Sequence, residues 1–162
     1  MNSKGFTFLE VLLVLSIIGI LSTIAVSDIS AFTDKFNLQS AARQISTDLR
    51  EMKMLSTIER SNLTVDFDTV NNFYDLPGRR SNLPQGIRFG FSPGVLGPPN
   101  NPAETPDTDG VTFISNRVSF YSQGSNSLGT IYITNDRNVT MAISLSITGK
   151  IKIWRWNGER WG

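Results

Sequence analysis

The stretch that decides the fold is Lys4-Gly5-Phe6-Thr7-Phe8-Leu9-Glu10, continued by the apolar run VLLVLSIIGILSTIAV at residues 11–26. Glu10 is the only charged residue between Phe6 and Val26. About 20 mostly apolar residues suffice for a helix to cross the hydrocarbon core of a bilayer, so residues 6–27 are predicted to form a transmembrane helix. Lys4, just before the run, favours a cytoplasmic N-terminus.

An ordinary secretory signal peptide is the alternative for this segment, with Lys4 in its basic region and Ala25-Val26-Ser27 as a small-residue cleavage site. Glu10 speaks against it, because a carboxylate inside an apolar segment costs on the order of 2–4 kcal/mol and therefore needs a partner. A signal peptide that is cut off has no use for such a residue. The helical pattern also continues beyond Ser27, which favours a retained helix.

These residues resemble the class III signal of type IV prepilins and pseudopilins: a glycine, an aromatic residue and a lone Glu four positions later, all ahead of an apolar run. The resemblance implies that residues 1–5 are a leader, that prepilin peptidase cleaves between Gly5 and Phe6, and that the new N-terminal Phe6 is methylated. It also implies a single-pass protein of the bacterial inner membrane, with its globular domain in the periplasm and other pilins or pseudopilins as its filament partners.

The same resemblance assigns a role to Glu10. Cleavage would create a positive amine at Phe6, which lies one helical turn from Glu10. In this family the Glu of one subunit pairs with the terminal amine of a neighbour. Because a paired charge in lipid is far less costly than a lone one, Glu10 is predicted to drive assembly and to set the axial register. The alternative is an interfacial residue tolerated near the lipid headgroups.

The helical pattern becomes amphipathic after Asp28. A 4-3-4-3 spacing predicts one apolar stripe, formed by Leu38, Ala42, Ile45, Leu49 and Met52. No proline or glycine interrupts residues 20–75. Residues 28–60 are therefore predicted to be the amphipathic half of one helix that runs from Phe6 to about Arg60. Many major pilins have a kinking proline near the end of the apolar run, and Ser27 stands in that stretch here, which favours a minor subunit.

Beyond Ser61 the period of the pattern changes to two, and residues 61–162 are predicted to form an antiparallel β domain. Its predicted strands are Leu63–Phe67, Gly86–Phe91, Val111–Ile114, Arg117–Tyr121, Thr130–Thr134 and Val139–Trp156, the last bent or broken at Gly149. The proline-rich stretch 93–110 is predicted to be a long loop. A helix followed by strands predicts an α+β fold with the helix packed on an antiparallel sheet, which is the type IV pilin-like fold.

The C-terminal part is similar to the GspH/FimT group of minor pseudopilins. Similarity lies in Arg117-Val118-Ser119-Phe120 with Gly124, in Gly129-Thr130-Ile131, and in the closing segment Gly149-Lys150-Ile151-Lys152. The resemblance implies a minor pilin or pseudopilin of a type II secretion system or a type IV pilus. Lys150 and Lys152 stand where arginines are common in the group, and a lysine cannot make the bidentate contacts of a guanidinium.

The closing strand also suggests a binding surface. Alternation places Lys150, Lys152, Trp154 and Trp156 on the face away from the core, with Arg155 and Arg160 near in sequence. Basic groups interleaved with aromatic rings suit single-stranded nucleic acid, and some FimT-like proteins bind DNA during natural transformation. DNA uptake is therefore the alternative function. The plainer interpretation is that the tryptophans pack over the sheet edge or against a neighbouring subunit, with the lysines solvated.

Composition narrows the remaining classes. The chain has no cysteine and no histidine, which excludes disulfides, thiolate metal sites and catalysis based on either residue. No carboxylate pair or nucleophile–base pair stands out, so we expect no enzyme, no cofactor and no metal. Asp107 and Asp109 are spaced as in a calcium loop, but the final Glu of that pattern is missing, and an ordinary turn is favoured.

Overall fold

The computed structural model describes residues 7–162, apart from the side chains of residues 23–31. The chain divides into two compact units, Met1–Thr33 and Asp34–Gly162, which are considered separately below. We refer to the second as the globular unit. A single helix, α1 (Phe8–Ile58), contributes residues to both. Within the described residues the prediction of one long helix is confirmed, and this helix ends two residues before the predicted Arg60; the predicted start at Phe6 lies outside the described residues.

The end of α1 is set by a local hydrogen-bond motif. Arg60 adopts a left-handed conformation (φ 52°), and the Ser61 N–H donates to the Ser56 carbonyl at 3.1 Å. This is the hydrogen bond of a Schellman cap, in which glycine usually occupies the left-handed position that Arg60 has here. The predicted apolar stripe from Leu38 to Met52 is buried throughout, so the 3.6-residue period correctly identified the face of α1 that packs on the domain.

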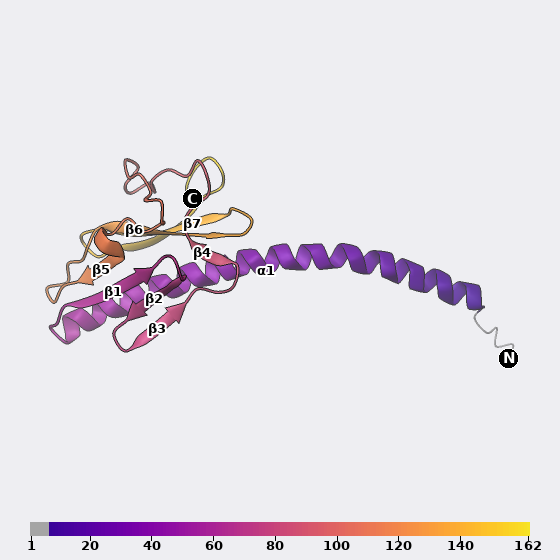
Figure 1. Cartoon of the computed structure of the whole chain (residues 1–162), viewed down its shortest axis with the longest axis horizontal. Coiled ribbons are helices and arrows are strands. Elements are labelled where there is room, and N and C mark those ends of the chain that lie inside the picture. Colours follow the sequence, from indigo (N-terminus) through magenta and orange to yellow (C-terminus); the bar gives the residue numbers. More distant parts are fainter. Residues whose placement is uncertain (1–6) are drawn as a thin grey trace. The chain divides into compact units, whose positions relative to one another are not determined.

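The globular unit contains two antiparallel sheets rather than the single sheet expected (Figure 1). The first has the order β3-β2-β1-β5 and consists of β1 (Leu63–Asp68), β2 (Phe73–Leu76), β3 (Arg79–Asn82) and β5 (Arg117–Phe120). The second has the order β4-β6-β7-β8 and consists of β4 (Ile87–Phe89), β6 (Gly129–Asn135), β7 (Thr140–Leu145) and β8 (Ile151–Arg155). Side chains of both sheets and of α1 form one core.

The strand predictions differ from the structure in two places. The hairpin β2–β3 was missed: Gly78-Arg79-Arg80 is predicted to be a solvated turn, but Arg79 and Arg80 belong to β3 and are ion-paired. The expected strand at Val111–Ile114 is reduced to a single bridge between Val111 and Ile131, followed by a 3-10 turn, η1 (Ile114–Asn116). The long closing strand is broken at Gly149, as one of the two alternatives had it, into β7 and β8.

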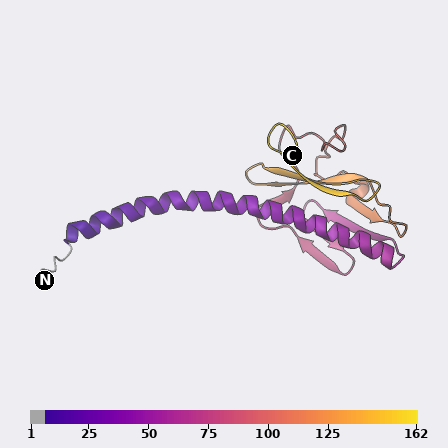
Figure 2. The same ribbon diagram turned by 180° about the vertical axis from the view of Figure 1, so that it is seen from behind.

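A second apolar cluster lies on one face of the β4-β6-β7-β8 sheet. Loops cover this face, which is turned away from the part of α1 in the globular unit (Figures 1 and 2). The 93–110 loop and the C-terminal residues supply its cover, and its members are Phe91, Val95, Tyr132, Ala142, Trp154, Trp156 and Trp161. Glu104 ties the loop to the sheet, since its carboxylate accepts from the hydroxyls of Thr130 (2.8 Å) and Thr112. Burial on both faces explains why every residue of β6 and β7 is buried.

Candidate functional site

The first turn of α1 is organised around Glu10. The Thr7 N–H and hydroxyl both donate to Glu10 Oε2 at 3.2 Å, and the Glu10 N–H donates to Thr7 Oγ1 at 3.3 Å. This reciprocal arrangement is a capping box, which satisfies main-chain donors that the helix leaves unpaired. The part played by Thr7 was missed in the sequence, although the Thr-x-x-Glu spacing signals it.

The residues that follow Glu10 are apolar on every side of the helix. From Phe8 to Leu21 the large side chains are exposed in the isolated chain, Phe8 to 79%. The polar side chains in this run turn back to their own helix: Ser16 donates to the Leu12 carbonyl at 2.8 Å and Ser22 to the Ile18 carbonyl at 2.7 Å. An all-apolar helix surface of this kind calls for an apolar environment.

The predicted processing site is not part of the described chain. Gly5 and Phe6, the predicted cleavage and methylation residues, are outside the described residues. Among the residues that are described, no helix meets the combined length and apolarity criterion for crossing a membrane.

The structure separates the predicted binding residues of the closing strand. Lys150 lies in the exposed turn before β8, and Lys152 and Trp154 lie side by side on one face of β8, with Lys152 Nζ 4.8 Å from the Trp154 ring centre. The Trp154 side chain is held by the neighbouring strand β7, because its indole N–H donates to Ser144 Oγ at 2.8 Å. Arg155 and Arg160 are both exposed.

Trp156 does not lie on a free surface as expected. It is only 9% exposed and packs edge-on against Trp161, with ring centres 5.3 Å apart, inside the second apolar cluster. Trp161 is fixed in turn by a hydrogen bond from its indole N–H to the Leu96 carbonyl at 2.8 Å. The cause is the 93–110 loop, which folds over this face of the sheet. Trp156 is therefore a core residue, in keeping with the plainer interpretation.

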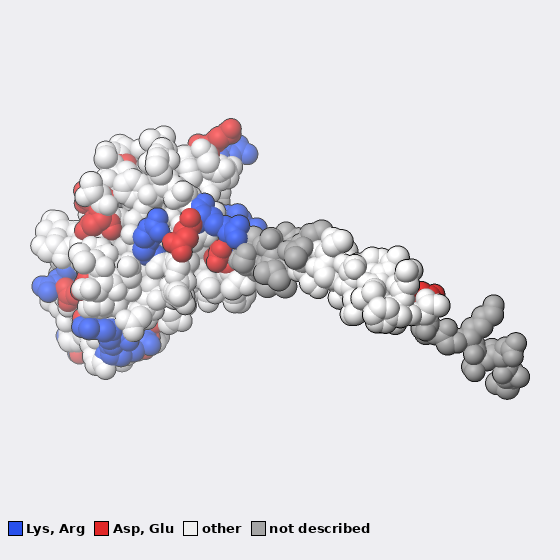
Figure 3. All heavy atoms as spheres, turned by 45° about the vertical axis from the view of Figure 1, so that its right-hand side comes forward, with Lys and Arg blue, Asp and Glu red and all other residues white. Residues whose placement is uncertain are grey.

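Two further cations extend the basic residues of β8 onto α1. The Arg50 guanidinium donates to the Ile151 carbonyl at 3.3 Å, and Lys53 Nζ donates to the carbonyls of Thr148 and Gly149 at 3.3 and 3.1 Å. Arg50, Lys53, Lys150, Lys152 and Arg155 form no ion pair with any described residue, and we call them the β8 basic strip. On the face of the globular unit shown in Figure 3, basic and acidic atoms lie next to one another at several places, and basic atoms gather at its lower edge.

A buried carboxylate joins α1 to the β2–β3 hairpin. Asp48 is 1% exposed and accepts from the Tyr74 hydroxyl at 2.5 Å, from Arg79 at 2.7 Å and from Gln44 at 2.9 Å. Arg79 also contacts Glu51 at 2.9 Å. Burial and the bond to Asp48 raise the pKa of Tyr74 well above its ordinary value. The residues form a structural clamp, since a buried carboxylate with this many donors is satisfied rather than reactive.

The remaining acidic candidates behave as turn residues. Asp109 Oδ1 accepts from the Val111 N–H at 3.2 Å and Oδ2 from the Asn116 amide at 2.6 Å, and the Gly110 N–H bonds the Asp107 carbonyl at 2.8 Å. Within the described part of the chain, no cluster of acidic side chains is suited to hold a metal ion.

Comparison with known proteins finds one match for the N-terminal residues and one for the fold. Residues 1–26 match the prokaryotic N-terminal methylation motif. Among solved structures, the chain is similar to the minor pseudopilin EpsH from the type 2 secretion system of Vibrio cholerae, with a TM-score of 0.52 and 12% identity over 76% of this chain and 99% of that one. No curated protein matches the chain significantly. The protein thus joins a prepilin-type methylation motif to a type IV pilin-like fold of the kind seen in a minor pseudopilin.

Proposed function

We propose that this protein is a minor pseudopilin or minor pilin, a structural and non-catalytic subunit of a type II secretion filament or a type IV pilus. Prepilin peptidase would remove residues 1–5, Phe6 would be methylated, and residues 6–27 would anchor the chain in the inner membrane with the globular unit in the periplasm. The observation that carries the proposal is the methylation motif on a chain with a pilin-like fold. Neighbouring pilins or pseudopilins would be its partners.

Glu10 is the residue on which assembly would depend. Its carboxylate is already engaged by Thr7 in the isolated chain, which offsets part of the cost of placing a charge in lipid. The engagement uses Oε2 alone, so Oε1 stays available to accept from the amine of a neighbouring Phe6. An ammonium–carboxylate pair formed in a low-dielectric surrounding is much stronger than the neutral hydrogen bonds of the cap.

Substitution of Glu10 tests this function. Glu10→Ala and Glu10→Lys should leave membrane insertion and leader removal intact but should block incorporation into sheared filaments. Glu59→Ala, which removes an exposed carboxylate in the turn just after α1, is the matched control and should assemble normally. The readouts are the mass of the mature N-terminus and the amount of subunit in the sheared fraction. Normal incorporation of both Glu10 variants would overturn the proposal, as would a mature chain that begins at Asp28.

A second function, DNA binding during uptake, has one observation in its favour, the β8 basic strip. The burial of Trp156 removes one of the two rings that could stack on a base, so contact would fall mainly on phosphates. The full chain in detergent should then retard duplex DNA, with an affinity that falls steeply as salt rises. The double variant Lys150→Ala with Lys152→Ala should lose most of it, whereas Arg88→Ala, whose charge is paired with Asp136, should not. Absence of retardation at low salt eliminates this function.

A further inference from the structure

The edge strands of the two sheets differ in whether their outward main-chain groups are hydrogen-bonded. Loop residue Ser127 covers β5, because its N–H donates to the Ser119 carbonyl and its hydroxyl accepts from the Ser119 N–H, both at 3.0 Å. The Asn72 side chain accepts from the Phe89 N–H and covers β4. On β8, the Arg50 side chain donates to the Ile151 carbonyl, and Arg155 and Gly162 exchange two main-chain hydrogen bonds. Proteins commonly close sheet edges in such ways.

The edge of β3 is the exception. The Leu83 N–H donates to the Asn72 carbonyl at 2.9 Å, and register then makes Tyr74–Ser81 and Leu76–Arg79 hydrogen-bonded pairs. The alternate residues, Arg80 and Asn82, must direct their main-chain N–H and C=O groups outward. No described residue bonds these groups. The sheet therefore ends in an open set of donors and acceptors.

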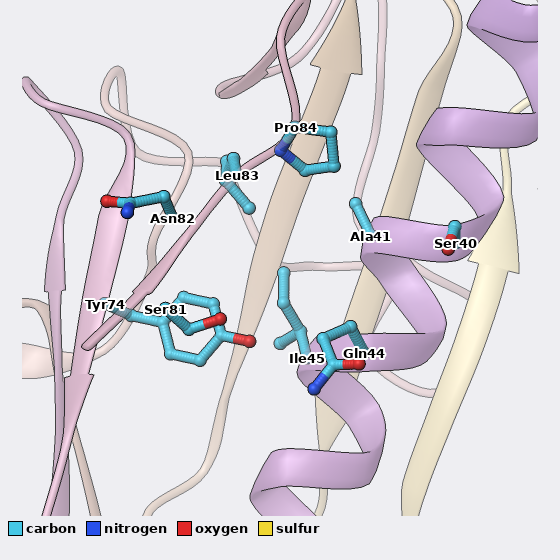
Figure 4. Close-up of a pocket in the computed structure, with 9 residues that line it drawn as sticks. All are labelled: Ser40, Ala41, Gln44, Ile45, Tyr74, Ser81, Asn82, Leu83 and Pro84. Atoms are coloured by element: carbon cyan, nitrogen blue, oxygen red, sulfur yellow. The ribbon is translucent and has the colours of Figure 1, made fainter. Parts of the chain in front are cut away.

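A cavity of about 230 Å³ lies beside this edge, between β3 and α1 (Figure 4). Ala41, Ile45 and Gln44 line it from the helix, with Tyr74 and Ser81 across from them, and Leu83 and Pro84 line its end. None of the residues that line it is charged. A strand added outside β3 would turn every second side chain towards α1, as Arg79 and Ser81 do, and thus into this cavity.

We call the cavity and the open edge of β3 beside it the groove. Both arginines of β3 are already ion-paired. Arg80 is bonded to both oxygens of Asp75 at 2.7 and 2.9 Å and lies over the Phe73 ring at 3.7 Å. Arg79 is held by Asp48 and Glu51. Arginines on an edge strand usually repel a second strand, but these two are paired, so electrostatic complementarity favours an uncharged occupant. The Asp48 clamp also fixes β3 against α1, so the groove is preformed.

We propose that this groove is a docking site for an extended, uncharged segment of a partner protein. The segment would pair with the main chain of Arg80 and Asn82 as an added strand and insert one aliphatic side chain between Ala41, Ile45 and Leu83. Main-chain bonds supply affinity in this mode of recognition, and the pocket for alternate side chains supplies specificity. The inference rests on the fold alone and does not depend on the filament function.

Two variants close the site without removing a bond of the fold. Asn82→Pro deletes an outward N–H, and proline is tolerated on edge strands. Ser40→Phe places a ring at the exposed mouth of the cavity. The controls are Asn82→Thr, which keeps the N–H, and Thr47→Phe, which adds the same ring to an exposed site of α1 that does not line the cavity. Unchanged circular dichroism and thermal midpoint confirm folding of each.

A library of random decapeptides selected on the full chain in detergent provides the probe. We expect enriched peptides to be uncharged and rich in aliphatic and β-branched residues, and to bind at least about tenfold more weakly to Asn82→Pro and to Ser40→Phe than to either control. Enriched acidic or basic peptides, or equal binding to all variants, would overturn the proposal. Dimerisation of the full chain that Asn82→Pro abolishes would overturn it too, because the occupant would then be a second copy.

Discussion

Two segments of α1 have the same helical backbone conformation but differ in whether their apolar side chains are buried. Apart from Glu10 and two serines, residues 8–22 are apolar or glycine, and their large side chains are exposed on every side in the isolated chain. Residues 38–52 instead present one apolar stripe, which is buried by the chain's own sheets. Helix formation therefore does not depend on where the apolar surface finds a partner. The apolar surface of the second segment is buried when the chain folds. The apolar surface of the first segment calls for a membrane or a partner protein outside this chain.

The largest expected difference between the two segments is the cost of losing one leucine. Leu49→Ala should destabilise the globular unit by about 2–5 kcal/mol, because Leu49 is fully buried and its loss leaves a cavity. Leu13→Ala, the matched change in an exposed apolar position, should stay within about 0.5 kcal/mol. Tryptophan fluorescence during urea unfolding measures both, since all three tryptophans lie in the globular unit. Equal effects would show that the first segment also packs on the globular unit.

The buried segment also contains a polar anchor that the exposed one lacks. Asp48→Ala should cost about 2 kcal/mol, since the Tyr74 hydroxyl loses its acceptor in the core. Glu51→Ala, which removes the exposed partner of the same Arg79, should cost at most about 0.5 kcal/mol. Urea unfolding at pH 7 measures the difference. A loss as large for Glu51→Ala would mean that the surface pair, not the buried bond, holds the hairpin to α1.

Features that depend on neighbouring residues could be predicted from the sequence, whereas features that depend on contacts between distant residues could not. Periodicity along one helix is local, so the stripe from Leu38 to Met52 was predicted correctly. The β2–β3 hairpin was not, because Arg79 breaks the alternation on its inward face, and only Asp48, distant in sequence, makes that position suitable for an arginine.

The prediction that Trp156 lies on a free surface was wrong for a similar reason. Alternation correctly groups Trp154 and Trp156 on one face of the sheet, but it carries no information about the 93–110 loop that covers that face. The docking groove beside β3 could not be predicted either, since it depends on the missed hairpin and on which sheet edges remain open. The N-terminal motif was found because its seven residues are contiguous.

Alkaline pH should separate the anchored hairpin from the rest. The pKa of Tyr74 is raised in the folded state above its ordinary value of 10, so its contribution is complete below pH 10 and is lost as the pH rises through the raised folded value. Stability should therefore fall above pH 10. Tyr74→Phe should lose about 1 kcal/mol at pH 7 and show a shallower alkaline decline. Urea midpoints at pH 8 and pH 10.5 test this, and parallel declines in both proteins would contradict it.

A pair of substitutions in the first turn of α1 separates two roles of Glu10. Glu10→Gln keeps the capping box, because glutamine serves at this position as glutamate does, but it removes the charge. Thr7→Ala keeps the charge and removes the cap, at a cost of about 1 kcal/mol to the first turn. If assembly depends on charge, Glu10→Gln should reduce incorporation into sheared filaments far more than Thr7→Ala, while hydrogen exchange in the first turn should rise only in Thr7→Ala. The reverse order would mean that Glu10 acts by starting the helix, and that the apolar surface of residues 8–22 alone directs the chain to its partners.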